Sequence, residues 1–308
     1  MTWILHIIDR NTLKKKNNLQ GIALAVLATL IWSGNFIVAR GVHKEITPVQ
    51  LAFYRWGTAT ILLFPFALKT CIAEWPQLKK HLPYLFWISL TGISLFNTLV
   101  YIAGHYTSAI NLALIGTTSS PVFANILARI FLKEKLGVAK ISGMLICIVG
   151  ILVLLSKGNL QNLLNLHFSE GDAWVLLAAL SFAVYTILVK KRPPVISPLN
   201  LLFSSFLLGT LLLLPVFLFE MSADKHVTWN LSLAGVILYL GLGASIISFL
   251  IWNKSIRILG AGRTALFGNL IPVFSSLEAV IILHEQFSII HIISMLIVLA
   301  GLVIANKS

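Results

Sequence analysis

Charged residues are scarce in this sequence, making up 11% of its 308 residues against 58% hydrophobic residues. A soluble globular domain carries about 25% charged residues. The shortage excludes a chain that folds around one core in water, and it indicates helices that cross a lipid bilayer. Because a spanning helix needs about 20 apolar residues, the length allows about ten spans with short loops and leaves no room for a sizeable soluble domain.

Acidic residues and cysteines are also few. Asp and Glu number 10 against 23 Lys and Arg, and there are two cysteines. Cys71 and Cys147 lie outside any CxxC pattern, the histidines form no HExxH motif, and no Walker A loop is present. We therefore expect no disulfide framework, metal site, cofactor or ATP hydrolysis. We expect no nucleic-acid partner either, because the net charge of +13 has a topological explanation.

The apolar runs divide the chain into two halves. We expect a basic tail at 1–18, a first repeat at 19–156, a polar linker at 157–170 and a second repeat at 171–306. The first run is long and is not followed by a convincing cleavage site, so it indicates an uncleaved span and not a signal peptide. The ten predicted spans are 19–39, 47–68, 84–104, 108–132, 137–156, 172–190, 197–219, 230–252, 260–283 and 288–306.

Internal repetition supports this division. Pro121 and Pro272 open matching stretches at an offset of 151 residues, and Pro48 and Pro198 belong to a second match at an offset of 150. Five spans per half is an odd number, so the second half must enter the membrane in the opposite sense, as an inverted repeat. A proline inside a span removes a backbone hydrogen bond and kinks the helix. We therefore expect Pro121 and Pro272 to mark a site near the membrane midplane.

Basic residues predict the orientation. With the N-terminus in the cytoplasm, seventeen Lys and Arg fall in inner segments and four in outer segments. Inner loops of membrane proteins carry the excess of positive charge. We therefore expect both termini to be cytoplasmic and the linker 157–170 to lie on the outer side.

Several motifs make the sequence similar to a known family. The stretches 32–36 (WSGNF), 53–56 (FYRW), 106–111 (YTSAIN) and 269–274 (NLIPVF), with Glu285, resemble the drug/metabolite transporter superfamily of EamA type. The resemblance covers 19–306. It implies an all-helical membrane protein with ten helices in two inverted five-helix repeats, and a central cavity. It also implies export of small metabolites, often amino acids, or of toxic compounds, across a bacterial inner membrane.

Two charged residues lie within the predicted spans, away from their ends. Arg55 stands about eight residues into its span, and a charge within the membrane usually faces the protein interior. It could attract an anionic group of a substrate, fix the fold through an ion pair or a carbonyl, or reach the outer interface. Glu278 follows Pro272 by six residues. It could exchange a proton during transport, pair with Arg55, or line a solvated wall.

Polar and aromatic residues within the spans are candidates for the substrate cavity. Amides and aromatic rings suit a cavity for amphipathic amino acids, although packing, interfacial anchoring and repair of a broken helix are alternatives. With Arg55, these candidates are Trp32, Asn35, Asn97, Tyr101, Thr118, Tyr185, Trp252, Asn253 and Asn269.

The sequence and the resemblance together predict a metabolite exporter that works by alternating access, with a proton as candidate coupling ion. Import or facilitated movement of nucleotide-linked or phosphorylated metabolites is the alternative. A membrane enzyme would need an acid/base or nucleophile cluster near the interface, and none is evident. Because both repeats lie in one chain, we expect a monomer with a small-molecule substrate and the lipid bilayer as partners.

Overall fold

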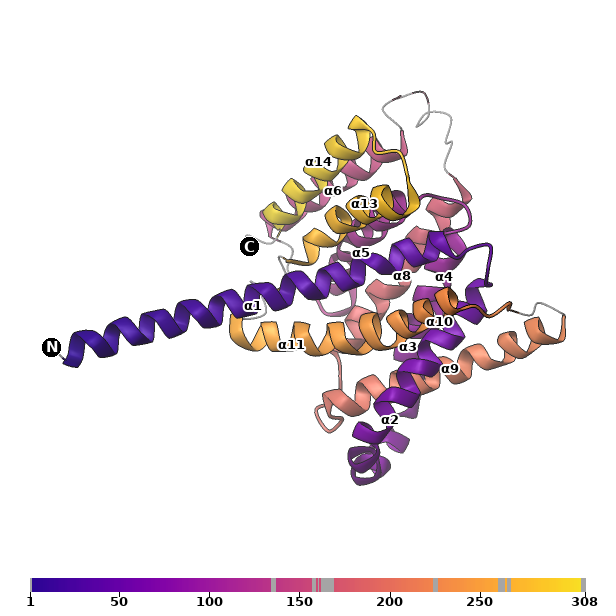
Figure 1. The fold of residues 1–308 in the computed structure, drawn as a ribbon, viewed down its shortest axis with the longest axis horizontal. Helices are drawn as coiled ribbons and strands as arrows, with labels where there is room; N and C mark the ends of the chain where they lie inside the picture. Colours follow the sequence, from indigo (N-terminus) through magenta and orange to yellow (C-terminus); the bar gives the residue numbers. More distant parts are fainter. Residues whose placement is uncertain are drawn as a thin grey trace.

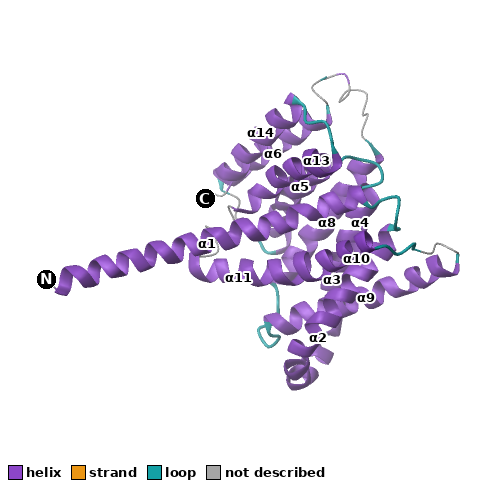
Figure 2. Ribbon diagram, viewed as in Figure 1, coloured by secondary structure: helices purple, strands orange, loops and turns teal. Residues whose placement is uncertain are grey.

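The computed structural model is built of helices, with no strand among the residues that it describes (Figures 1 and 2). These residues are 2–133, 137–156, 159, 161, 169–223, 227–259, 264 and 267–305, and side chains are described from residue 18 onward. Most of the expected linker, 157–170, lies outside the described residues.

The first half starts with a helix that projects far beyond the bundle (Figure 1). Helix α1 covers Thr2–Gly41, so the backbone of the expected tail continues into the first span without a break. The first half continues with α2 (Pro48–Lys80), α3 (Leu82–Ser89), the π-helical stretch η1 (Leu90–Leu95), α4 (Phe96–Ala103), α5 (Ala109–Phe131) and α6 (Val138–Leu155).

The second half has the same order of elements. It comprises α8 (Glu170–Lys190), α9 (Pro198–Ser222), α10 (Leu231–Leu238), the π-helical stretch η2 (Tyr239–Ile247), α11 (Ser248–Leu259), the 3₁₀ turn η3 (Gly268–Leu270), α13 (Ile271–Leu283) and α14 (Ile289–Ala305).

The outside of the bundle is suited to lipid. Within the described residues, eight helices are long and apolar enough to cross a membrane, and Gly268–Leu283 and Ile289–Ala305 form two shorter apolar helices. Large hydrophobic side chains face outward, among them Ile61, Phe66 and Leu231, the last of which is 91% exposed. Such an apolar surface is unfavourable in water and favourable in a bilayer, so the protein is a multi-pass membrane protein.

Helices α2 and α9 begin in the same way, at positions 150 residues apart. The side chains of Thr47 and Ser197 cap them, accepting hydrogen bonds from the third residue of each helix, and a proline follows each cap. This combination is a common helix start. The two helices are also fastened to each other, because Thr47 donates to Glu220 near the end of α9 and the Ser197 amide donates to Glu74 near the end of α2.

Packing between the halves follows a pseudo-twofold pattern. Helix α1 packs on α13 and α11, and its counterpart α8 packs on α5 and α4. The pairs α2 with α9 and α6 with α14 each join equivalent helices, and the second pair lies at one edge of the bundle (Figure 1). This pattern fits two inverted repeats that exchange equivalent contacts.

Three features differ from the expectation drawn from local pattern. Helix α2 runs on to Lys80, beyond the expected end at 68. The third span of each half contains a π-helical stretch, a rare conformation that is frequent at functional sites.

Pro121 lies inside a continuous α5, whereas Pro272 stands in the first turn of α13, directly after η3. The two prolines are therefore not equivalent breaks, because the first turn of a helix accepts proline without losing a hydrogen bond.

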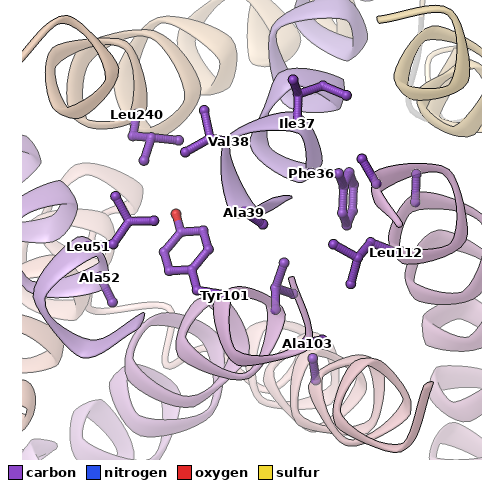
Figure 3. Close-up of a cluster of buried hydrophobic side chains, with 14 of the residues drawn as sticks. Phe36, Ile37, Val38, Ala39, Leu51, Ala52, Tyr101, Ala103, Leu112 and Leu240 are labelled. Carbon is purple, nitrogen blue, oxygen red and sulfur yellow. The ribbon is translucent and has the colours of Figure 1, made fainter. Parts of the chain in front are cut away.

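The main apolar core forms where α1, α2, α4 and α5 meet. Phe36, Leu51 and Leu112 belong to it, and Leu240 joins from η2. Figure 3 shows Tyr101 among these side chains, with its hydroxyl pointing into the space between Leu51 and Leu240. A polar atom so placed needs a partner, and the partners form the candidate site.

Candidate functional site

Arg55 on α2 is the centre of the buried polar groups. Its side chain is 5% exposed. Its Nε donates to the Ser245 hydroxyl at 3.1 Å. Its Nη1 donates to Asn97 Oδ1 at 2.7 Å, to the Tyr101 hydroxyl at 2.8 Å and to Asn35 Oδ1. Four helical elements, α1, α2, α4 and η2, therefore converge on one guanidinium.

The partners of Arg55 also bond to one another. Tyr101 donates its hydroxyl hydrogen to Asn35 Oδ1 at 3.1 Å. We call Asn35, Arg55, Asn97, Tyr101 and Ser245 the Arg55 network. All five are buried, and every partner is neutral. The guanidinium carbon also lies 4.5 Å from the ring centroid of Trp56, which adds a cation–π contact.

The charge of Arg55 is solvated by dipoles and not by a protein anion. No carboxylate lies in the Arg55 network, and its Nη2 makes no hydrogen bond within the described residues. A charge near the middle of a membrane helix costs at least about 2.5–3.5 kcal/mol. Neutral acceptors offset part of that cost, and an arriving anion would offset more because a guanidinium binds a carboxylate through two parallel hydrogen bonds.

The π-helical stretches place residues of the Arg55 network. Stretch η1 ends just before α4, which carries Asn97 and Tyr101 one turn apart, and η2 contains Ser245. The sequence pattern did not single out Ser245 as a candidate. Its counterpart at an offset of 151 is Ser94, which donates to the Gly209 carbonyl at 3.0 Å. This repeated serine was the signal that could have identified the position.

Glu278 occupies a separate position beside α1. Its Oε1 accepts a hydrogen bond from Ser33 at 2.8 Å, whereas its buried Oε2 has no partner. Ser275, one turn earlier on α13, donates to the Ser33 carbonyl at 3.0 Å. The structure shows no ion pair between Glu278 and Arg55, so it does not support the alternative in which they pair.

An aromatic group lies next to these residues. Trp32 on α1 donates its indole hydrogen to the Ala244 carbonyl at 3.0 Å. Its ring centroid lies 5.1 Å from that of Trp252 and 5.4 Å from that of Phe249, both on α11. Two of the expected cavity residues, Trp32 and Trp252, are therefore neighbours, on the α1 segment that also carries Ser33 and Asn35.

Four further candidates make no hydrogen bond to the Arg55 network. Thr118 is fully buried on α5, and its hydroxyl has no partner. Tyr185 is half-buried on α8 and packs against Phe182. Asn269 is half-buried in η3, and Asn253 is exposed on α11. Within the described residues, no group of three His, Cys, Asp or Glu side chains is placed to hold a metal ion.

Comparison with known proteins places the chain in a family. The model of the EamA-like transporter family matches it twice, at residues 19–156 and 169–307. The uncharacterized transporter YyaM of Bacillus subtilis is 26% identical over 286 residues, covering 92% of this chain and 93% of that protein. An uncharacterized transporter of Archaeoglobus fulgidus is 28% identical over 288 residues, covering 90% and 94%.

Two further comparisons extend the similarity to a plant protein and to a solved structure. The WAT1-related protein At4g30420 of Arabidopsis thaliana is 27% identical over 304 residues, covering 89% of this chain and 81% of that protein. One solved crystal structure superposes with a TM-score of 0.62 at 18% identity, covering 94% of this chain and 96% of the other. The two family matches and the all-helical bundle with its repeated contacts agree: the chain belongs to the EamA-like transporter family.

Proposed function

We propose that this protein exports small metabolites with a carboxylate group, such as amino acids, by alternating access, with Arg55 as the group that binds the carboxylate. The observation that carries the proposal is a buried guanidinium held only by neutral partners, with Nη2 free of hydrogen bonds to the described residues. A buried cation that has no protein anion beside it has an electrostatic preference for an anionic ligand.

The neighbouring groups suit the remainder of an amino acid. Trp32 and Trp252 offer aromatic faces beside the α1 segment that carries Asn35. Sites for small molecules combine apolar walls with a few polar groups that fix orientation. Arg55 would orient the carboxylate, and the tryptophan pair would accept an apolar side chain.

Glu278 is the proposed coupling residue. Its Oε2 is buried without a hydrogen-bond donor in reach, and Oε1 is held by Ser33 on α1. A carboxyl group in such a place can take up a proton on one side of the membrane and release it on the other when its access changes. Because α13 and α1 belong to different halves, rocking of the halves would change that access.

The proposed setting is a bacterial inner membrane with both termini in the cytoplasm and the protein as a monomer. The excess of basic residues in the segments placed inside supports the orientation, and the presence of both repeats in one chain favours the monomer. The alternative substrate class, phosphorylated or nucleotide-linked metabolites, is less favoured. Arg55 is the one charged member of the Arg55 network, and a phosphate group normally recruits several cations.

The test is uptake of a panel of radiolabelled amino acids by proteoliposomes, with and without a pH gradient. We expect Arg55→Gln to lower uptake roughly 30-fold or more, the equivalent of about 2 kcal/mol for a truncated partner of a buried charge pair. Arg55→Lys keeps the charge but lacks the planar guanidinium, so its uptake should lie between that of the wild type and that of Arg55→Gln. The matched control is Arg257→Gln, which removes an exposed guanidinium on α11.

Two outcomes would count against the proposal. Wild-type kinetics in a correctly folded Arg55→Gln protein would exclude Arg55 as the anion-binding group. A pH-gradient dependence that survives in Glu278→Gln would exclude Glu278 as the coupling residue. Folding is checked by size-exclusion chromatography of each variant.

A further inference from the structure

A cavity lined mainly by charged, histidine and hydroxyl-bearing residues opens where α1, the α4–α5 loop and the end of α13 meet, and none of these residues belongs to the Arg55 network. Its volume is about 500 Å³. It is lined by Arg40 and His43 near the end of α1, by His105 and Tyr106 in the loop, and by His284 and Glu285 after α13. We call it the vestibule. In the orientation proposed above it faces the outside of the cell.

The one carboxylate of the vestibule is already satisfied. Glu285 accepts hydrogen bonds from the amides of Ala109 and Ile110, at 2.7 Å on Oε1 and 3.2 Å on Oε2. These amides are free donors at the start of α5, where the helix dipole also favours a negative charge. The N-terminus of α5 therefore balances much of the charge of Glu285. Only part of that charge is available to compensate the cations of the vestibule.

The basic groups of the vestibule are held in place by backbone carbonyls. Arg40 Nη1 donates to the carbonyls of Gly104 and His105 at 3.1 and 3.3 Å. His43 Nδ1 lies 2.6 Å from the Arg40 carbonyl, an arrangement in which Nδ1 donates. The His43 and His105 ring centroids are 5.5 Å apart. Burial, then His43 and Arg40, hold the pKa of His105 below its usual value.

We propose that the vestibule is a second binding site, which takes the carboxylate of a small solute through Arg40, His43 and His105. Three of the four nitrogen-bearing side chains that line the cavity come from the end of α1 and the α4–α5 loop, and the single acid there is engaged with α5. A carboxylate bound among them would supply the counter-charge that Glu285 provides only in part. The role of the vestibule as a station on the path to Arg55 rests on the proposed function; the binding itself does not.

The site should bind more strongly as the pH falls. His105 carries this expectation. The other ionisable side chains that line the vestibule are Arg40, His43, Tyr106, His284 and Glu285, the last of which is held by α5. Because the pKa of His105 is lowered, its protonation and the added attraction for an anion occur below the usual pH range of an imidazole.

The experiment is histidine modification by diethylpyrocarbonate on the purified full-length protein, read by mass spectrometry at each histidine. The probe is acetate, compared with chloride at equal ionic strength. Acetate at about ten times its Kd should lower modification of His43 and His105 roughly tenfold. His81, which lies outside the vestibule at the end of α2, is the internal control and should not change.

Variants separate this site from the Arg55 network. We expect Arg40→Gln to abolish the protection by acetate. Lys44→Gln, which removes an exposed cation a few residues away that does not line the vestibule, should keep it. Arg55→Gln should also keep it, so failure of the proposed function would leave this result intact. Protection should be stronger at pH 6 than at pH 7.5.

Three results would overturn the proposal. They are the absence of acetate-specific protection in the wild type, equal protection in Arg40→Gln, and loss of protection in Arg55→Gln together with its retention in Arg40→Gln. The last pattern would assign the acetate effect to the Arg55 network.

Discussion

Tyr101 is buried and is held in place by hydrogen bonds to the charged Arg55 and to Asn35. Its side chain is 1% exposed, and its hydroxyl accepts from Arg55 and donates to Asn35. Arg55 Nη1 has two hydrogens for three acceptors, so each acceptor holds only a share of the donor. When one acceptor is lost, the remaining acceptors share the two hydrogens differently. We therefore expect the effects of substitutions in the Arg55 network on stability to be non-additive.

Tyr101→Phe should destabilise the protein and weaken substrate binding. The ring still fills its place, while Arg55 loses an acceptor and Asn35 loses a donor. We expect the free energy of unfolding to fall by about 1.5–3 kcal/mol, the usual contribution of a hydrogen bond to a charged group. The measurements are thermal unfolding in detergent and the KM for uptake. Tyr106→Phe is the control, because Tyr106 is 51% exposed. Equal effects of the two substitutions would contradict the prediction.

The α6–α14 pair illustrates packing between whole helices through small residues. A Cβ on Gly143 would lie 2.5 Å from the Ala305 amide nitrogen and the Gly301 carbonyl oxygen. A Cβ on Gly301 would lie 2.7 Å from the Gly143 carbonyl oxygen. Because the obstructing atoms are backbone, they cannot move aside as a flexible side chain would. Small residues allow such close approach of helices in lipid, where dispersion and hydrogen bonds replace the hydrophobic effect.

Gly143→Ala should therefore push α6 away from α14. We expect a loss of stability of about 1–3 kcal/mol, typical of overpacking, seen as a lower midpoint of thermal aggregation in detergent. The matched control is Gly235→Ala on α10, where an added Cβ would meet nothing within 4 Å. An unchanged midpoint for Gly143→Ala would show that the two helices are less closely packed in the membrane.

The arrangement of the whole bundle depends on an odd number of spans in each half. Five spans separate Lys44 from Lys191, namely α2, the α3–η1–α4 span, α5, α6 and α8. Because five is an odd number, these two residues should lie on opposite sides of the membrane. Both are exposed. The two native cysteines, Cys71 and Cys147, are unpaired and can be replaced to give a background free of thiols.

We expect Lys44→Cys to react with a membrane-impermeant maleimide in intact cells, and Lys191→Cys to react only after permeabilisation. The reason is the orientation set by basic residues near the cytoplasmic ends of the spans. Labelling of the cell surface shows which side each residue faces. Reaction of both from outside would mean an even number of crossings between them and would contradict the two five-span halves.

Local pattern in the sequence was enough to indicate the membrane spans and the repetition of the halves, because hydropathy and residue spacing act over single helices. Residue type alone made Asn97 and Tyr101 candidates for the cavity, and the structure places both beside Arg55; their role in binding a substrate stays a prediction. Local pattern was not enough to show that α2 continues to Lys80 or that Pro272 stands in the first turn of a helix. Helix ends depend on packing and caps as well as on apolar content.

The sequence by itself therefore determined an all-helical membrane protein of two repeats with one charge deep in the second span. Only the tertiary structure decided what surrounds that charge. Ser245, which lies in the π-helical stretch η2, bonds to Arg55, whereas Glu278 bonds to Ser33 and makes no ion pair with Arg55. Asn253 is exposed while its neighbour Trp252 packs against Trp32. Such contacts join residues from distant spans, and their geometry follows from how the helices pack and not from the order of residues along any one of them.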